Sequence, residues 1–416
     1  MALGDHPQDE ALRAAWRGFC RKLEAAGEQV FKDLVPSNGA QRADGFRFLT
    51  QNLSQAFDLA LETRNPKYPV IHAFCTPFRK LGGDNADFLY QQAWIDGASA
   101  YRISGNKGTC RFLNIAVQGA RPTSRADAPD WRPLHEPFGD TPQANIFGDQ
   151  LDSAADGSFE LYIGGEQHGP NWLPTTPESR KLFIRHGFDD WSERPATLRI
   201  ERIGMTAPRP VPTPEEVIGA VDWAAEFVSG MMADWPEWPF AFGEGVDPNQ
   251  LNRFPEEEKN TDDPVYNPEL DKKRGRAPQT MCWKLAPDEA LIVEWDRNDL
   301  FWMMTNMGMM FNSMDYLYRP VSYSPARAKV DLDGKVRLVL AHQDPGIHNW
   351  VDTQGFERGV LCNRNMMTGQ HTDFRTRVVK HAGLAAALPD SARTDPEERG
   401  RQMLDRFHSI LRRMGM

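Results

Sequence analysis

The sequence contains few cysteines and no cysteine pair at a spacing typical of redox or metal-binding motifs. The 416 residues include five cysteines, at positions 20, 75, 110, 282 and 362. A disulfide framework or a zinc site usually shows an even or closely spaced set. We therefore expect free thiols, most of them buried, in a reducing cytoplasm.

Long hydrophobic runs and an excess of basic residues are also missing. No apolar run approaches the roughly 20 residues that a membrane-spanning helix needs. The N-terminal segment lacks a charged start followed by an apolar core, so we expect no secretory signal. With 48 Lys and Arg against 58 Asp and Glu, the net charge is -10. These features predict a cytoplasmic protein that binds neither a membrane nor nucleic acid.

Several catalytic signatures are absent from the sequence. There is no Walker loop, no G-x-S-x-G elbow, no H-E-x-x-H and no Rossmann glycine fingerprint. Gly82-Gly83-Asp84-Asn85 and the segment 105–108 are interpreted as turns, because no helix follows them. Nucleotide-dependent and serine-hydrolase chemistries are therefore disfavoured.

The chain contains an internal repeat. Residues 156–175 read DGSFELYIGGEQHGPNWLPT, and residues 333–353 read DGKVRLVLAHQDPGIHNWVDT. The same landmarks follow in the same order: Arg185 and Arg364, then an alternating strand ending at Gly204 and Gly383, then Pro-Glu-Glu at Pro214 and Pro396. A shared order at nearly constant spacing indicates a duplication.

Helical periodicity is confined to four stretches. Residues 7–35 and 40–62 have apolar residues at spacings of three and four, which predicts an N-terminal helical pair that covers a sheet. Helix starts at Thr213-Pro214-Glu215-Glu216 and near Asp395 predict one further helix after each repeat.

Strand periodicity dominates the rest of the chain. Strands are predicted at 89–95, 99–104, 109–117, 158–163, 181–185, 196–203, 279–285 and 290–295. Segments 119–149 and 236–279 are rich in Pro, Asp and Gly and are interpreted as a long surface loop and an irregular linker. We predict a mainly β protein with two tandem jelly-roll or β-sandwich domains, each followed by an α-helix, plus the N-terminal helical pair. The predicted segments are 1–68 (helical), 69–206 (first sandwich), 207–278 (helix and linker), 279–385 (second sandwich) and 386–416 (C-terminal helix).

The first repeat resembles a known family. The segment from Asp156 to Trp191, with its DG-strand, NWLP turn and strand ending in Arg185, is similar to the domain-of-unknown-function family 1214 (DUF1214). The upstream Asp96-Gly97 and Tyr101-Arg102-Ile103 also fit that family. The resemblance extends over about 89–204 and, less closely, over 290–383, where NWVDT replaces NWLPT. It implies a jelly-roll-like β fold and carries no established activity.

The repeated Asn-Trp and Arg positions have two interpretations. Asn171-Trp172 and Asn349-Trp350 follow Gly/Pro bends, where Asn can cap a turn and Trp can close the end of a sandwich. Alternatively, Trp350 could form a ligand platform. Arg185 and Arg364 are expected to bridge strands, or to hold a substrate carboxylate or sulfate.

The second repeat carries polar residues that the first lacks. His342 and Asp344 follow a strand, and His348 and Asp352 lie in the next loop. A His-x-Asp pair on a β fold can supply two of the three ligands of non-haem iron, with His371 or His381 as the third. Asp344 before Pro-Gly can instead cap a turn, and the four residues can act in metal-free acid/base catalysis. We expect no cofactor, with non-haem iron as the alternative.

The segment 301–323 is rich in methionine and aromatic residues. It is either an ordinary core strand pair or the wall of a pocket for a bulky apolar ligand. The residues expected to bind such a ligand are Trp302, Met303, Met307, Asn312, Asp315, Tyr316, Trp350 and Arg364.

These observations lead to one functional prediction and two alternatives. We expect a hydrolase or lyase that acts on a small steroid-, terpenoid- or aromatic-like molecule by cofactor-independent acid/base chemistry, at a site between the two sandwiches. The alternatives are a non-catalytic binding protein for the same ligands and a glycan-handling protein, because tandem β-sandwiches with exposed Trp often bind sugars.

Overall fold

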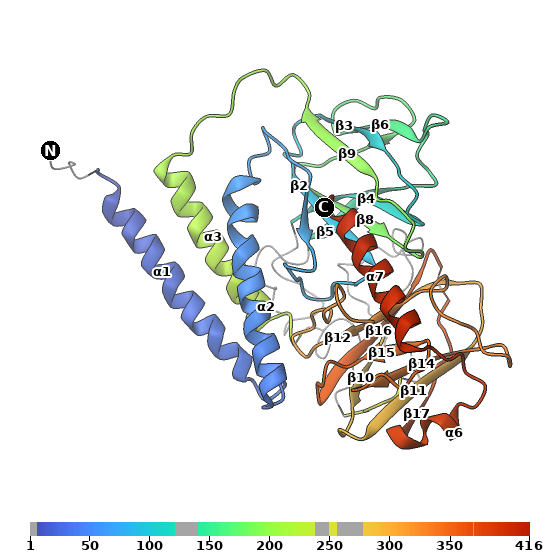
Figure 1. Ribbon diagram of the computed structural model, residues 1–416. Coiled ribbons are helices and arrows are strands. Elements are labelled where there is room, and N and C mark those ends of the chain that lie inside the picture. The colour runs from blue at the N-terminus through green and yellow to red at the C-terminus, as the bar shows by residue number, and fades with distance from the viewer. Residues whose placement is uncertain (1–5, 121–139, 238–248, 256–277, 369) are drawn as a thin grey trace.

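A computed structural model describes residues 6–120, 140–237, 249–255, 278–368 and 370–416 (Figure 1). Most of the predicted surface loop (121–139) and most of the predicted linker (238–248 and 256–277) lie outside the described residues. Within the described parts of the chain, no helix is both long and apolar enough to span a bilayer.

The helices begin and end close to the predicted positions. Both later helices start where the sequence predicts: Thr213 and Glu216 form a reciprocal capping box, and the Asp395 carboxylate accepts the Glu398 amide. In chain order the helical elements are α1 (Asp9–Glu28), η1 (Gln29–Phe31), α2 (Gly39–Phe57), η2 (Asp58–Glu62), α3 (Pro214–Ala233), η3 (His381–Gly383), α6 (Leu384–Ala387) and α7 (Pro396–Arg413).

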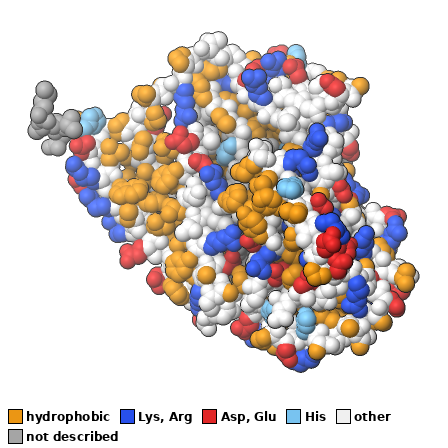
Figure 2. All heavy atoms as spheres, in the orientation of Figure 1, with side chains coloured by type: hydrophobic (Ala, Val, Ile, Leu, Met, Phe, Trp, Pro, Cys, Tyr) orange, Lys and Arg blue, Asp and Glu red, His pale blue; other side chains and the backbone are white. Residues whose placement is uncertain are grey.

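Three long helices form one layer beside the sheets (Figure 1). The predicted N-terminal pair is present, and α3 packs against both α1 and α2 more extensively than these two pack against each other. The N-terminal pair alone would leave one apolar face uncovered, and α3 covers it. Hydrophobic side chains remain on the surface of this layer (Figure 2). Trp16 of α1, Phe31 of η1 and Phe46 of α2 are 54%, 52% and 42% exposed.

The first half contains two sheets. One has the order β1-β2-β8-β4-β5 and the other β7-β6-β3-β9. The strands are β1 (His72–Cys75), β2 (Phe88–Trp94), β3 (Tyr101–Asn106), β4 (Phe112–Gly119), β5 (Thr141–Phe147), β6 (Ser158–Ile163), β7 (Trp172–Leu173), β8 (Ser179–Gly187) and β9 (Thr197–Arg202).

The second half repeats this arrangement without a counterpart of β1. Its sheets have the orders β10-β16-β12-β13 and β15-β14-β11-β17, which match β2-β8-β4-β5 and β7-β6-β3-β9 strand for strand. Even the parallel pair β6–β7 recurs as β14–β15. The strands are β10 (Gln279–Lys284), β11 (Glu289–Asp296), β12 (Phe301–Met307), β13 (Ser322–Tyr323), β14 (Lys335–Ala341), β15 (Trp350–Asp352), β16 (Arg358–Met366) and β17 (Arg375–Lys380).

The repeated Asn-Trp turns make the same hydrogen bonds in both halves. The Asn171 amide donates to the Asp152 and Glu160 carbonyls, and the Asn349 amide donates to the Lys329 and Arg337 carbonyls. Each Trp indole N–H donates to a backbone carbonyl at the end of the neighbouring strand. The Asn side chains are thus structural, as one of the two interpretations expected, but they tie the turn to backbone 11 to 20 residues away and do not cap it locally. The shared strand order and shared bonds are what a duplicated module predicts.

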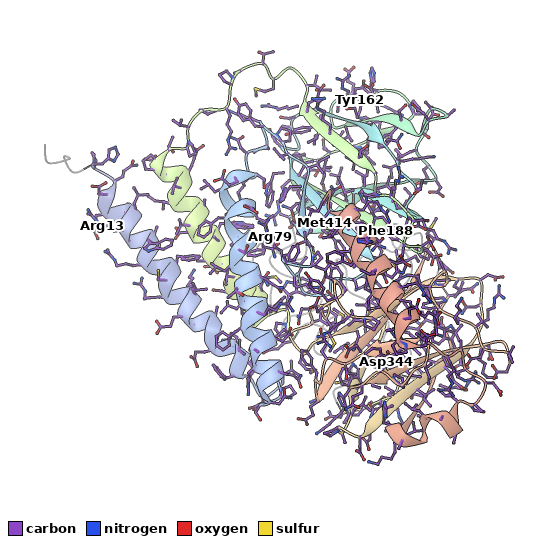
Figure 3. All side chains as sticks on the ribbon, in the orientation of Figure 1. Arg13, Arg79, Tyr162, Phe188, Asp344 and Met414 are labelled. Atoms are coloured by element: carbon purple, nitrogen blue, oxygen red, sulfur yellow. The ribbon has the colours of Figure 1, made fainter. Side chains whose placement is uncertain are left out.

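Helix α7 contacts both halves, although it follows the second (Figure 1). Its N-terminal part binds the second half through Arg399, and its C-terminal part reaches Phe188 and Trp191 of the first half. Figure 3 shows Met414, just after α7, close to Phe188. The last helix of the chain therefore lies across the junction of the two halves.

Candidate active site at the junction of the two halves

The predicted pair His342 and Asp344 lies in the turn after β14, which ends at Ala341. The His342 Nδ1 atom is 2.7 Å from the Thr353 hydroxyl. The Asp344 carboxylate accepts the Gly346 amide and pairs with the Arg399 guanidinium at 2.9 Å. Asp344 thus caps the Pro-Gly turn, which was one of the three interpretations open from the sequence.

His348 and Asp352 are buried and bind other neighbours. The Nδ1 atom of His348 is 2.8 Å from the Gln402 amide, and burial lowers the pKa of this imidazole. The Asp352 carboxylate pairs with Arg319 at 2.6 Å. The structure therefore places the four predicted residues around one loop, each held by its own partner. Among the described residues, no three His, Cys, Asp or Glu side chains are grouped so that they could hold a metal ion.

The methionine-rich segment forms β12 and the loop that follows it. Its apolar side chains are distributed over three hydrophobic clusters: Met303 packs with the helix layer, Met304 with the core of the second half, and Met307 with Phe311 and β16. All three are at most 1% exposed. The segment is thus core, and its role as a pocket wall stays a prediction.

Three of the other predicted ligand-binding residues make separate contacts. Trp302 is buried against Trp295, with ring centroids 5.0 Å apart. Trp350 lies on β15, and the Arg399 guanidinium of α7 lies 5.3 Å from the centroid of the Trp350 ring. Arg364 reaches from β16 toward the Gly83 carbonyl.

A buried polar group that the sequence did not single out lies where the two halves meet. Lys80 and Asp84 come from the segment between β1 and β2, and Ser313 comes from the loop after β12. The Lys80 ammonium donates to the Ser313 hydroxyl at 2.6 Å, and that hydroxyl donates to the Asp84 carboxylate. The Ser313 backbone amide also donates to Asp84, at 2.7 Å. We call these three residues the junction triad.

Burial dominates the electrostatics of the triad. Lys80, Asp84 and Ser313 are 2%, 3% and 1% exposed. Desolvation lowers the pKa of the Lys80 ammonium, although Asp84 lies 3.9 Å away and opposes this shift. The Tyr316 ring lies 3.7 Å from the ammonium and stabilises the cation. The neighbours thus stabilise the Lys80 cation, whereas burial favours its neutral form.

Helix α2 places a second acid next to the triad. The Asp44 carboxylate accepts the Asn312 amide at 3.2 Å, and desolvation raises the pKa of this carboxyl. Arg47 and Asp315 lie at the outer edge, 4.0 Å apart, with half of the Arg47 side chain exposed. A carboxyl with a raised pKa and a lysine with a lowered one therefore occupy the same site, an arrangement found where proton transfer is catalysed.

The loop that carries Ser313 is strained. Phe311 has a φ of +57°, in the left-handed region that bulky side chains avoid, and its side chain is fully buried. The Phe311 carbonyl accepts the Gly83 amide at 2.7 Å, which ties this residue to the segment bearing Lys80 and Asp84. Such strain persists only where the surroundings impose it, and it concentrates at functional sites.

Sequence reasoning missed the triad because its members lie far apart in the chain. Ser313 falls inside the methionine-rich segment, and 233 positions separate it from Lys80. The one available signal was that Lys80 precedes Asp84 by four residues. From the sequence, we interpret Gly82-Gly83-Asp84-Asn85 as a turn only.

Comparisons with known proteins find one similar structure and name no activity. An uncharacterized protein from Burkholderia cenocepacia has a similar structure, with a TM-score of 0.77 and 29% sequence identity over 89% of this chain and 97% of its own. A protein from Vibrio parahaemolyticus aligns with a TM-score of 0.44 and 11% identity over 86% of this chain and 100% of its own. No curated protein matches the sequence. Residues 90–186, which make up most of the first half, match the family "Protein of unknown function (DUF1214)".

Proposed function

We propose that the protein is a cofactor-independent hydrolase for a small, largely apolar acyl compound, with the junction triad as its catalytic group. The observation that carries the proposal is the Ser313 hydroxyl held between a carboxylate and a buried ammonium. A nucleophile, a base within hydrogen-bond reach and a third group that orients them are the parts that covalent catalysis requires. They are recognised by geometry and not by sequence position, so the missing G-x-S-x-G motif does not exclude them.

The chemistry follows from the observed hydrogen bonds. The Ser313 oxygen attacks the acyl carbon while Asp84 accepts its proton, and the Lys80 ammonium stabilises the negative charge near that oxygen. Asp84 then returns the proton to the departing alcohol. In the second step Asp84 takes a proton from the water that attacks the acyl carbon. It returns that proton to the Ser313 oxygen as the acid is released. Because all three groups are buried, substrate reaches Ser313 only when the loop 308–313 moves away from α2.

The apolar neighbours favour an apolar substrate. Met310 and Met314 flank Ser313 in the chain, and Tyr316 covers Lys80. Methionine adapts its shape to irregular ligands. This composition supports the class of substrate that the sequence predicts, a small steroid-, terpenoid- or aromatic-like molecule, to which the triad adds the requirement of an acyl group.

The test is turnover of a panel of aryl and alkyl esters by wild-type protein and by Ser313→Ala. We expect Ser313→Ala to reduce kcat by at least about 100-fold while the protein stays folded. The matched control is Ser99→Ala, since Ser99 is also buried and donates to a carboxylate, that of Asp96, without a lysine. Equal turnover by Ser313→Ala and wild type would exclude the assignment.

A fluorophosphonate probe gives a second readout that needs no known substrate. Labelling of Ser313, located by peptide mass spectrometry and lost in Asp84→Asn, supports nucleophilic catalysis. If the protein instead releases an unaltered apolar ligand on denaturation and no labelling occurs, it is a binding protein.

A further inference from the structure

Helix α7 directs a row of arginines into the protein. Arg399, Arg406 and Arg413 are spaced by seven residues, which places them on one face of the helix. Their exposed fractions are 8%, 2% and 3%. Arginine is almost never this deeply buried unless it has a partner, so each of the three requires a counterpart in the surrounding structure.

Arg399 has a complete set of partners, and Arg406 has an incomplete one. Arg399 pairs with Asp344 and donates to the Ile347 and His348 carbonyls. Arg406 donates to the backbone and hydroxyl oxygens of Ser322, whereas its Nε atom has no partner among the described residues. The number of guanidinium donors with a hydrogen-bond partner therefore decreases toward the C-terminal end of the helix.

Arg413 has no hydrogen-bond partner at all within the part of the chain that the structure describes. Its three nitrogens are buried and unpaired, and one turn earlier the buried Ser409 hydroxyl is unpaired as well. The Phe188 ring lies 4.0 Å from this guanidinium. A ring face stabilises the charge but accepts none of the five N–H groups in good geometry, so the donors point to an acceptor that the protein does not supply.

Positive charge is in excess at this place. Arg327, Arg406 and Arg413 surround the Trp191 ring at 4.3, 4.8 and 5.5 Å from its centroid. The fully buried Asp87 pairs with Arg327 at 2.5 Å, and its charge also attracts Arg406 and Arg413, so one carboxylate faces three guanidinium groups.

The other nearby acids are engaged elsewhere. Asp189 pairs with Arg111. The Glu193 carboxylate accepts the backbone amides of Arg111, Asp189 and Asp190. Uncompensated charge in a low-dielectric interior is costly. Water could satisfy the donors but would not balance the charge.

We propose that a compact oxyanion, a carboxylate or a phosphate-like group, binds between α7 and the Trp191 turn, with Arg413 and Ser409 as its principal donors. Guanidinium groups match the geometry of carboxylate and phosphate oxygens and bind them with two parallel hydrogen bonds. Since Arg413 comes from α7 and Phe188 from the first half, the bound anion links the two halves. This site is separate from the junction triad, and neither proposal depends on the other.

The test uses full-length protein that has been dialysed into a buffer whose only anion is chloride. Inorganic phosphate, sulfate and acetate are titrated at constant ionic strength, and binding is followed by the thermal unfolding midpoint and by calorimetry. We expect saturable binding of one anion per chain with an increase of several degrees in the midpoint. A response to phosphate and sulfate alone identifies a tetrahedral anion, and a response to acetate identifies a carboxylate.

Two variants locate the site. Arg413→Met should abolish the anion-dependent shift, and Ser409→Ala should weaken binding several-fold without removing a charge. Arg401→Met is the control, because Arg401 lies on the exposed face of α7 and pairs with Glu397. The proposal is overturned if no anion binds saturably, or if Arg413→Met or Ser409→Ala responds like wild type.

Discussion

At the scale of single residues, burial sets the protonation of the histidines. His186 on β8 is fully buried, and its Nδ1 atom accepts the Ala196 amide at 3.2 Å. Burial lowers the pKa of this imidazole from 6.5 to about 3. Between pH 6.5 and about 3 the folded protein therefore keeps His186 neutral, whereas the unfolded chain protonates it.

This difference makes stability depend on pH with a defined sign. Between pH 6.5 and about 3 the unfolded state binds a proton at His186 that the folded state does not bind. The free energy of unfolding therefore decreases as the pH falls through this window, by up to about 1.4 kcal/mol per pH unit, and His186 has no effect above it. Urea unfolding of wild type and His186→Gln between pH 7.5 and 4.5 measures the difference in slope.

The control for this measurement is the exposed His168, whose ring lies against Tyr162. His168→Gln should keep the slope of wild type, because folding does not bury this side chain. An unchanged slope in His186→Gln would show that other groups cause the acid sensitivity.

Individual residues were predictable where their role is local. The Asp344 carboxylate accepts the Gly346 amide two residues on, a bond that the Asp-Pro-Gly sequence indicated. The backbone partners of Asn171 and Asn349 lie 19 and 20 positions away and were not predictable. The ion pair of Asp344 was not predictable either, since Arg399 lies 55 positions away. The Lys80–Ser313 contact crosses from one half to the other and leaves no pattern in the sequence.

At the scale of elements, two glycines differ in the space around them. In α3, a Cβ atom added at Gly219 would have no neighbour within 4 Å. In β3, a Cβ atom added at Gly105 would lie 1.9 Å from the Thr197 carbonyl oxygen on β9. The same substitution should therefore have opposite effects at the two positions.

We expect Gly219→Ala to stabilise the protein by about 0.5–1 kcal/mol, because alanine has less conformational freedom than glycine in the unfolded chain and loses less of it on folding. Gly105→Ala should destabilise it by about 1–3 kcal/mol, because β9 must shift away from β3. Thermal unfolding of the two variants measures both effects, and a destabilised Gly219→Ala would contradict the open surroundings described here.

Elements with clear periodicity were predicted within a few residues, such as β6 and α7. Strand β5 was missed because it follows a Pro-rich stretch that hides its alternation, and the four-residue β1 was too short to show any. The methionine-rich segment gave no clear period, because every residue of β12 is buried, so its two faces do not alternate between core and solvent.

At the scale of the whole molecule, buried polar contacts join the two halves. The Asp87 carboxylate of the first half pairs with Arg327 of the second, and the Ser324 hydroxyl donates to the Asp189 carbonyl. Burying these charges is costly unless both partners are present. We therefore expect the halves to unfold together and not as independent domains.

Asp87→Asn tests this coupling. Removing one partner leaves the Arg327 charge buried and unbalanced, so we expect a loss of about 3–5 kcal/mol in the free energy of unfolding. Tryptophan fluorescence and far-UV circular dichroism should report one shared, lowered midpoint in urea. The control is Glu397→Gln, which breaks an exposed pair with Arg401 and should leave the midpoint unchanged. Two separate transitions in wild type would argue against coupling.

The tandem arrangement was predictable from the repeated landmarks, and the two halves do share their strand order. The position of the last helix was not, since a buried arginine row and an exposed one have the same spacing in the sequence.

The location of α7 has a consequence for biosynthesis. A ribosome releases the first half long before residues 396–413 emerge, so Phe188 and Trp191 stay uncovered until these residues have been translated. Chains that stop before residue 396 should have an unsealed junction, which chaperones recognise and proteases cut, even though every strand of both sheet pairs has been made.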